Sequence, residues 1–364
     1  MFNDVIRSIK QSIEGRSNVL MAKRVGILTG GGDCPGLNPA IRGASMRLLN
    51  EGYEVIGLGQ GWKGLLEKIE RPIDKAYVEE ILWRGGTVLE SSRTNPYNMP
   101  GGVEKAKASF RELGLDALIA IGGDDTLGVA GKLYKEEGLP MVGVPKTMDN
   151  DVGGTEFCFG FDTAVTVAVD AVERLRDTAR SHRRILVLEV MGRYAGWVAL
   201  YTGMAGGADW ILIPEVELDW DEMCSSLMKQ QKRGKHYGVV VVSEGITIHE
   251  EVGSGEVDAF GHERLSLKGV GERVAQEIEK RTGVQTRSSA IGYIQRGGSP
   301  TVFDRMLATR MGYLAGDLIA KGCYGKMAAM VNGDIVPIDL ELAAETRTVP
   351  SEWYELAKAF FEEK

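Results

Sequence analysis

The sequence lacks several features that would assign it to a common protein class. It has no block of basic residues and a net charge of −8, which argues against nucleic acid as a partner. No apolar run reaches about 18 residues, so no membrane span is expected. The four cysteines lie far apart without a Cys-x-x-Cys pair, and the four histidines have no metal-ligand spacing. This pattern predicts free thiols in a reducing cytoplasm rather than a disulfide framework or a zinc site.

The composition is that of a soluble globular protein with room for two domains. The chain has 364 residues, of which 43% are hydrophobic and 26% charged. Residues 1–20 stand apart, because they show only a weak helical period and precede the first clear strand pattern. They contain no continuous apolar stretch of the kind that a secretory signal needs. We therefore expect residues 1–20 to form an N-terminal extension.

Strand-like and helix-like segments alternate along the rest of the chain, which is typical of parallel strands joined by helical crossovers. Strand patterns cover residues 24–29, 53–58, 117–121, 141–144, 185–190, 210–213, 238–243 and 289–294. Helical patterns cover residues 38–51, 103–113, 127–137, 164–179, 195–204, 221–232 and 270–281, and residues 250–269 resemble an exposed loop. The predicted fold class is α/β, with two doubly wound lobes of mostly parallel sheet. The expected lobes comprise residues 21–160 plus 295–334 and residues 161–294 plus 335–364.

A glycine-rich turn follows the first strand pattern. Gly30, Gly31, Gly32 and Asp33 lie between that strand and a helix that begins near Asn38. Glycines let backbone amides approach a phosphate, and a helix N-terminus adds a favourable dipole. The spacing matches neither a Walker A loop nor Gly-x-Gly-x-x-Gly, so an ordinary tight turn stays open as an alternative.

Two acidic residues follow the strand pattern at residues 117–121. Asp124 and Asp125 lie in the run Gly122-Gly123-Asp124-Asp125-Thr126. Open α/β sheets bind ligands at such strand ends, and magnesium favours one or two carboxylates together with phosphate oxygens. Asp124 is therefore a candidate Mg²⁺ ligand. The alternative is that the acidic pair caps the following helix and interacts with its dipole.

The strand pattern at residues 141–144 ends in a second polar cluster. Thr147, Asp149 and Asp151 alternate along it, so in an extended chain all three would point to one face. A carboxylate there can accept a proton from an attacking hydroxyl, while a threonine hydroxyl contacts a phosphate oxygen. Lys146 adds a cation beside them. With Asp124, this inventory predicts a phosphoryl-transfer site, and a cluster of Asx turns is the alternative.

Cations that suit a phosphate ester are scattered along the chain. They are Arg93, Arg184, Arg193, Arg287 and Arg296. Most of them follow a strand pattern or a glycine-rich turn, and guanidinium groups are natural ligands of a phosphomonoester. Any single arginine is more often a surface residue, so the set needs independent support.

That support comes from a resemblance to the phosphofructokinase family, which covers residues from about 21 to at least 326. The shared motifs occur in order as Leu28-Thr29-Gly30-Gly31-Gly32-Asp33-Cys34-Pro35-Gly36, Gly122-Gly123-Asp124, Thr147-Met148-Asp149-Asn150-Asp151, Met191-Gly192-Arg193, Ser243-Glu244-Gly245 and Gln295-Arg296-Gly297-Gly298. The resemblance implies two lobes with the active site in the cleft between them. It also implies transfer of a phosphoryl group to the 1-hydroxyl of fructose 6-phosphate.

The resemblance implies a role for each residue of the catalytic centre. Asp149 matches the base that activates the hydroxyl, Asp124 the Mg²⁺-associated carboxylate, and Thr147 the hydroxyl that contacts the transferred group. Arg193 matches the cation that stabilises that group. The residues expected to bind the donor are Gly31, Gly32, Arg93 and Asp125, with Lys146 acting beside them.

The resemblance also implies how the sugar phosphate is held. Asp151, Met191 and Glu244 would hold the sugar, and Arg184, Arg287 and Arg296 would clamp its 6-phosphate. In this family the residues at Arg184 and Arg287 come from a neighbouring subunit, so a homodimer or homotetramer is implied. Tyr293 stands where the ATP-using members usually have a histidine that touches the 6-phosphate.

Asp125 and Lys146 bear on the identity of the donor. The ATP-using bacterial members have glycine at both positions, which leaves room for the nucleotide. A carboxylate at Asp125 would crowd that region and repel a phosphate, while Lys146 would place a cation beside the donor. The pair resembles the pyrophosphate-dependent branch, which implies a reversible reaction of glycolysis and gluconeogenesis that uses pyrophosphate and fructose 6-phosphate.

Three alternatives stay open from the sequence. The first is an ATP-dependent 6-phosphofructokinase, since some ATP-using relatives also carry lysine at the position of Lys146. The second is a catalytically silent sensor of sugar phosphates, although such a protein should have lost Asp149 or Asp124. The third is a further acceptor such as sedoheptulose 7-phosphate, whose phosphate end suits the same clamp.

Overall fold

The computed structural model describes residues 23–248 and 269–361. The expected N-terminal extension and most of the expected loop at residues 250–269 lie outside this range. Among the helices of the described residues, none is long and apolar enough to cross a membrane.

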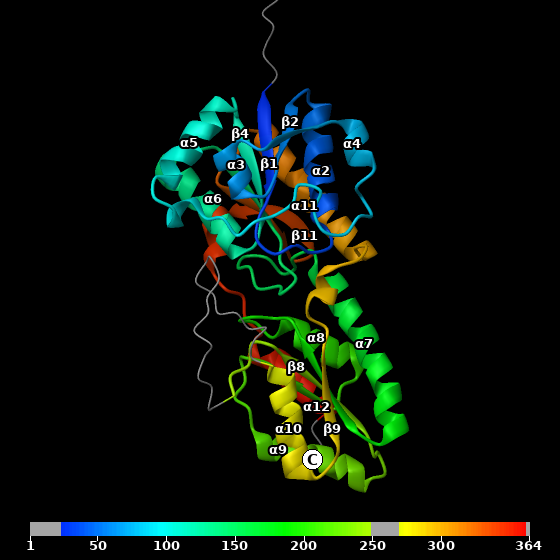
Figure 1. Cartoon of the computed structure of the whole chain (residues 1–364). Helices are drawn as coiled ribbons and strands as arrows, with labels where there is room; N and C mark the ends of the chain where they lie inside the picture. Colours follow the sequence, from blue (N-terminus) through cyan, green and yellow to red (C-terminus); the bar gives the residue numbers. More distant parts are fainter. Residues whose placement is uncertain (1–22, 249–268, 362–364) are drawn as a thin grey trace, which may run out of the picture.

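The first lobe is built on a seven-stranded sheet in the order β11-β10-β5-β4-β1-β2-β3 (Figure 1). Its strands are β1 (Arg24–Thr29), β2 (Glu54–Leu58), β3 (Glu70–Ile73), β4 (Ala117–Gly122), β5 (Met141–Pro145), β10 (Lys326–Val331) and β11 (Asp334–Asp339). The inner strands run parallel, and only the edge strands β3 and β11 pair in the antiparallel sense. Helices cover both faces, so the central strand β4 is buried along its whole length.

Two groups of helices enclose this sheet. One face is covered by α2 (Leu37–Asn50), α4 (Lys75–Glu79) and α11 (Val302–Ala320), which share one apolar core. The other face is covered by α3 (Trp62–Glu67), α5 (Gly102–Glu112), α6 (Asp124–Glu137) and the short η4 (Leu340–Ala344), which share a second core. A further 3₁₀ turn, η1 (Pro96–Asn98), precedes α5. Figure 1 shows the two groups on opposite sides of the upper lobe.

The second lobe has a smaller sheet, all parallel, in the order β7-β8-β6-β9. Its strands are β6 (Ile185–Val190), β7 (Trp210–Leu212), β8 (Gly238–Ser243) and β9 (Thr286–Ala290). The helices around it are α7 (Phe161–His182), α8 (Trp197–Gly206), α9 (Trp220–Lys232), α10 (Val270–Thr282) and α12 (Ser351–Phe361). Together they enclose a single core (Figure 1).

The path of the chain between the lobes differs from the sequence expectation at two points. The strand expected at residues 289–294 ends at Ala290 and gives way to the 3₁₀ helix η3 (Gly292–Arg296). The second lobe was expected to resume at residue 335, yet β11 still pairs with β10 in the first sheet. The reason is a tight hairpin in which Asn332 and Gly333 both take positive φ, a combination that matches the twist of paired strands. The chain returns to the second lobe after η4.

Helices α2 and α11 approach each other through glycines. A Cβ atom on Gly312 would collide with the carbonyl oxygen of Ala40, and one on Gly43 with that of Thr309. The obstacles are backbone atoms, which cannot rotate away as a side chain can. The close crossing therefore requires glycine at both positions.

We expect Gly312→Ala to lower the free energy of unfolding by about 1–3 kcal/mol, because the overpacking outweighs the gain in helix propensity. The control is Gly128→Ala in α6, where a Cβ would meet nothing within 4 Å. That substitution should raise stability by up to about 1 kcal/mol. Denaturant titrations of both variants measure the difference, and a stabilised Gly312→Ala protein would contradict the close crossing.

Candidate active site

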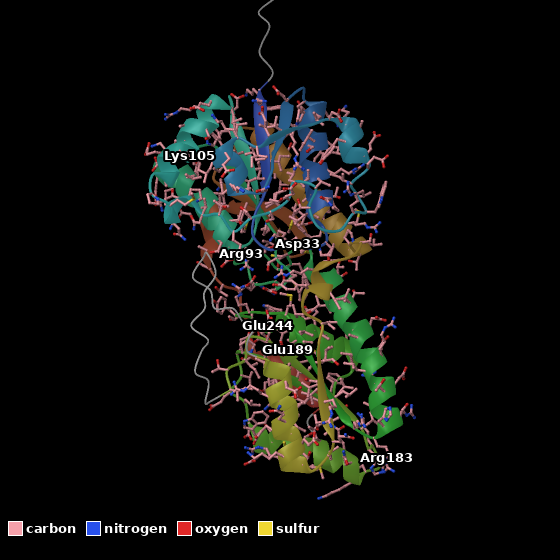
Figure 2. The ribbon with its side chains drawn as sticks, in the orientation of Figure 1. Asp33, Arg93, Lys105, Arg183, Glu189 and Glu244 are labelled. Carbon is pink, nitrogen blue, oxygen red and sulfur yellow. The ribbon has the colours of Figure 1, made fainter. Side chains whose placement is uncertain are left out.

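The carboxyl ends of strands from both sheets meet at one pocket. The residues lining it that were predicted from the sequence are Gly31, Gly32, Arg93, Asp124, Asp125, Lys146, Thr147, Asp149, Asp151, Met191, Arg193, Glu244 and Arg296. Figure 2 shows Arg93 at the lower edge of the first lobe and Glu244 at the facing edge of the second. Because parallel strands end at the same edge of a sheet, residues far apart in sequence converge here.

The glycine turn after β1 forms one wall of the pocket. The amide of Gly30 donates to the carbonyl of Ile121 at 2.9 Å, and that of Gly31 to Ser92 at 3.2 Å. Gly31 has a φ of 77°, and a Cβ on Gly30 would collide with the Thr126 side chain. The chain therefore forms a tight turn here, which was the alternative to a phosphate-binding loop. Gly31 and Gly32 of this turn also line the pocket.

Asp124 and Asp125 begin helix α6 instead of preceding it. The helix was expected from residue 127, but its N-cap is Gly123, and no side chain caps it. The alternative that an aspartate side chain caps the helix is therefore wrong. Both carboxylates do lie in the first turn, where they interact favourably with the helix dipole. Both side chains are half-buried and line the pocket.

Lys146 lies beneath the glycine turn with only 3% of its surface exposed. Its Nζ donates a hydrogen bond to the carbonyl oxygen of Gly32. Burial lowers the pKa of Lys146, while nearby anionic groups, including Asp33 and Asp149, act in the opposite direction. The arrangement fixes the Lys146 nitrogen against the glycine turn that forms one wall of the pocket.

The segment from Thr147 to Asp151 reaches the pocket in a different conformation from the one expected. The chain bends at Met148 and Asp149, and Asn150 takes a positive φ of 55°, so the segment is not extended. The amide of Asp149 donates to Thr147 Oγ1 at 3.1 Å, and Asn150 Oδ1 accepts from the amide of Cys158 at 2.9 Å. Side-chain bonds therefore shape residues 147–151, the candidate catalytic loop, and Thr147, Asp149 and Asp151 still line the pocket although the segment is not extended.

Burial controls the ionisation of the carboxylates in the pocket. It raises the pKa of Asp149, whereas Arg296 and Arg193 oppose that rise. Burial also raises the pKa of Asp151 and of Glu244 to about 7, and in each case the neighbouring charge of Asp149 adds to the effect. Within the described chain, Asp149 Oδ1 is buried and accepts no hydrogen bond.

The pocket offers few groups to a metal ion. Among residues 23–248 and 269–361 no cluster of three or more His, Cys, Asp or Glu side chains could hold one. A closed protein cage is therefore not formed by the described part of the chain. Asp124 with the buried Asp149 oxygen matches a site in which one or two carboxylates act together with phosphate oxygens.

Several residues that contribute to the site had no role in the sequence analysis. Gln295 is fully buried; its Oε1 accepts from the amide of Met191 at 2.8 Å, and its Nε2 donates to the carbonyl of Ala164 at 3.4 Å. The next residue, Arg296, donates to the carbonyl of Asp33 at 3.0 Å. The shared motif contained Gln295, but its bonding partners lie more than 100 residues away in the chain. Thr126 and Tyr194, which also line the pocket, were likewise missed.

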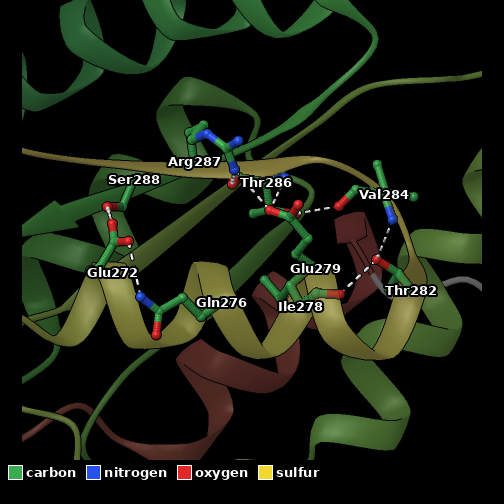
Figure 3. A network of polar contacts seen from close by, with 9 residues as sticks. All are labelled: Glu272, Gln276, Ile278, Glu279, Thr282, Val284, Thr286, Arg287 and Ser288. Carbon is green, nitrogen blue, oxygen red and sulfur yellow. Dashed lines mark hydrogen bonds and ion pairs between the residues drawn. The ribbon is translucent and has the colours of Figure 1, made fainter.

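The structure does not bring Arg184, Arg287 and Tyr293 to the pocket of this chain. Arg184 precedes β6 and Arg287 lies near the start of β9, while the pocket is at the opposite ends of these strands, roughly 20 Å away. Figure 3 shows Arg287 beside α10, where it pairs with Glu279 at 2.8 Å. Tyr293 is 74% exposed. One chain therefore supplies only Arg296 from the predicted phosphate clamp.

Comparisons with known proteins identify the family of the chain. A family model described as phosphofructokinase matches residues 24–319. The chain is 51% identical over 343 residues to the pyrophosphate–fructose 6-phosphate 1-phosphotransferase of Dictyoglomus thermophilum, with 93% of this chain and 98% of that protein covered. It is 46% identical over 336 residues to the ATP-dependent 6-phosphofructokinase 3 of Streptomyces coelicolor, with 91% and 98% covered.

Among solved structures, a pyrophosphate-dependent phosphofructokinase from Nitrosospira multiformis has a TM-score of 0.79 at 20% identity. That likeness covers 94% of this chain and 92% of the other, and at this identity it concerns the fold. The phosphofructokinase of Saccharomyces cerevisiae has a TM-score of 0.74 at 27% identity, with 93% and 45% covered. The two-lobed architecture, the motifs at the strand ends and the matched family model lead to one conclusion: the chain belongs to the phosphofructokinase family.

Proposed function

We propose that this protein is a pyrophosphate-dependent 6-phosphofructokinase. It transfers a phosphoryl group from pyrophosphate to the 1-hydroxyl of fructose 6-phosphate, reversibly, as a cytoplasmic step of glycolysis and gluconeogenesis. The observation that carries the choice of donor is that Asp125 and Lys146 line the same pocket as the glycine turn. The names of the relatives at about 50% identity support the same choice.

The two side chains select the donor by charge and by size. Asp125 adds a carboxylate at a point where a longer donor would place another phosphate, and the two negative charges would repel strongly in poorly screened space. Lys146 is fixed under the turn and stabilises a small, highly charged donor and its leaving phosphate. Gly31, Gly32 and Arg93 complete the wall at which the donor binds.

The catalytic loop and the second lobe act on the acceptor. Asp149 is the general base for the attacking hydroxyl, and Thr147 contacts the group in transfer. Arg193 offsets the negative charge that spreads over that group, while Asp151, Met191 and Glu244 hold the sugar. Arg296 binds the 6-phosphate from within the same chain.

A divalent cation completes the proposed site. Asp124 would hold Mg²⁺ together with phosphate oxygens of the donor, and the buried Asp149 oxygen lies in the same pocket. The ion would neutralise charge on the phosphates when bound. The chain's own cations, Lys146 and Arg193, share that task.

An ATP-dependent 6-phosphofructokinase is the second candidate, because a specific hollow favours it. Beyond Arg93 lies a hollow of about 320 Å³ lined in part by Lys63, Asn98 and Lys105. Such a hollow offers space to a larger donor that passes Arg93. Asp125 lines the main pocket but not this hollow, and Arg93 lines both.

A complete clamp for the 6-phosphate requires a second copy of the chain. Arg184 and Arg287 lie at the far ends of β6 and β9 and cannot reach this chain's own pocket. We infer that each pocket receives them from a neighbouring subunit in a homodimer or homotetramer.

The donor assignment predicts that the purified protein turns over with pyrophosphate at least about tenfold faster than with ATP. The double variant Asp125→Gly/Lys146→Gly should lose the pyrophosphate activity and gain weak ATP activity. Lys135→Gly, at the other end of α6, controls for the loss of an ammonium group. A coupled assay of fructose 1,6-bisphosphate formation measures all three proteins, and dominant ATP use by the natural chain would refute the assignment.

Shared sites predict that two defective variants restore activity when they assemble together. Asp149→Ala should abolish turnover while fructose 6-phosphate still binds, and Arg287→Ala should raise the KM for that sugar. In random assembly about half of the dimers are mixed, and one of the two sites in each mixed dimer is intact. Co-expression of the two variants should therefore recover about a quarter of the natural activity. Co-expression of Asp149→Ala with Arg193→Ala is the control, since both defects lie in one chain's pocket; equal recovery there would rule out sharing.

The raised pKa of Asp149 predicts the pH profile. A protonated base cannot accept a proton, so on acidification kcat/KM should begin to fall at a higher pH than an ordinary carboxyl group would give. Glu244→Gln removes a neighbouring negative charge, lowers the pKa of Asp149 and should move this acidic limb to lower pH. Glu217→Gln, an exposed carboxylate in the same lobe, is the control. An unmoved limb in Glu244→Gln would argue against Asp149 as the base.

A further inference from the structure

The segment between η4 and α12 runs beside the catalytic loop, although it lies outside the region that the family model matches. Its backbone forms a short antiparallel ladder with the loop. The amide of Gly153 donates to the carbonyl of Glu345, and the amide of Arg347 to that of Asp151, each at 2.7 Å. Val152 and Thr346 pair between them. The backbone that follows Asp149 is therefore held by residues about 195 positions later.

The side chain of Arg347 links this ladder to the second lobe. Its Nη1 donates to the carbonyl of Asn150 at 3.0 Å, and its guanidinium carbon lies 3.9 Å from the centre of the Trp197 ring. Trp197 Nε1 in turn donates to the carbonyl of Arg347 at 3.0 Å. Trp197 begins α8 and is 1% exposed, so it is a rigid anchor within the core of the second lobe.

The residue that Arg347 contacts is conformationally strained. Asn150 takes a left-handed φ of 55° between Asp149 and Asp151, and such a backbone persists only where its surroundings fix it. The side chain of Asn150 is fixed by the amide of Cys158. Its carbonyl is fixed by Arg347. If that carbonyl rotated, the directions of both flanking carboxylates would change.

We propose that Arg347 is a positioning residue, which holds Asp149 and Asp151 in register with Arg193 and Glu244 of the second lobe. An arginine is required because a planar guanidinium stacks with its face while it donates from its edge. A lysine ammonium cannot make both contacts at once. This inference rests on the proposed function, since it concerns the same catalytic loop.

The test compares Arg347→Met with Arg281→Met. Arg281 also lies over a tryptophan, at 5.6 Å from the Trp220 ring, but it pairs with Asp221 and Glu277 away from the pocket. We expect Arg347→Met to lower kcat by on the order of tenfold to a hundredfold, with the KM for pyrophosphate within about twofold. Arg281→Met should keep the natural kcat. Arg347→Lys should recover only part of the loss at a Tm close to that of the natural protein.

A second readout does not depend on activity. Amide hydrogen exchange of the peptide that covers residues 147–155 should quicken in Arg347→Met and stay unchanged in Arg281→Met. If the natural protein fails to turn over with either donor, the proposed function fails while the exchange result still decides the role of Arg347. If Arg347→Met does not fold, Arg347→Lys decides. Natural kcat in a folded Arg347 variant, or exchange that does not quicken in Arg347→Met, would overturn the inference.

Discussion

The burial of like-charged carboxylates is the constraint on which this site depends. Asp149, Asp151 and Glu244 share one pocket, and the negative charge of Asp149 adds to the rise in pKa that burial causes at the other two. Burial also raises the pKa of Asp149, the proposed base, and Arg296, Arg193 and Lys146 oppose that rise. Ionisation of Asp149 therefore depends on cations from different parts of the fold, and Gln295 of η3 bonds to the amide of Met191, two residues before Arg193.

The proposed donor choice rests on a local charge pattern within a fold that is common to both kinds of relative. Identity to the pyrophosphate-using and ATP-using proteins differs by only a few percent, and the solved structures share the architecture. Asp125 and Lys146 come from different elements, the first turn of α6 and the residue after β5, and they meet only through the parallel pairing of β4 and β5. Selectivity in this family can thus change without any change in the core.

Local patterns predicted the parts of the molecule that depend on near neighbours. β4 and β8 are buried on both faces, so each is a continuous apolar run with polar residues at its end. Their positions were predicted with small errors. The geometry of residues 147–151 was wrong, because the left-handed Asn150 depends on Cys158 and Arg347. The contacts of Gln295 and Arg347 were not predicted for the same reason. Their partners are distant in sequence, and no local pattern indicates them. Arg184 and Arg287 received a specific role, as part of the phosphate clamp, only through the resemblance.

The order of the strands has a consequence for synthesis on the ribosome. β5 pairs on one side with β4, yet its other neighbour, β10, follows about 180 residues later, after all four strands of the second sheet. Until then the growing chain presents an apolar strand edge with unpaired backbone groups, which invites pairing with other chains. Translation speed and chaperone capture during that interval should therefore determine how much of the nascent protein reaches the native state.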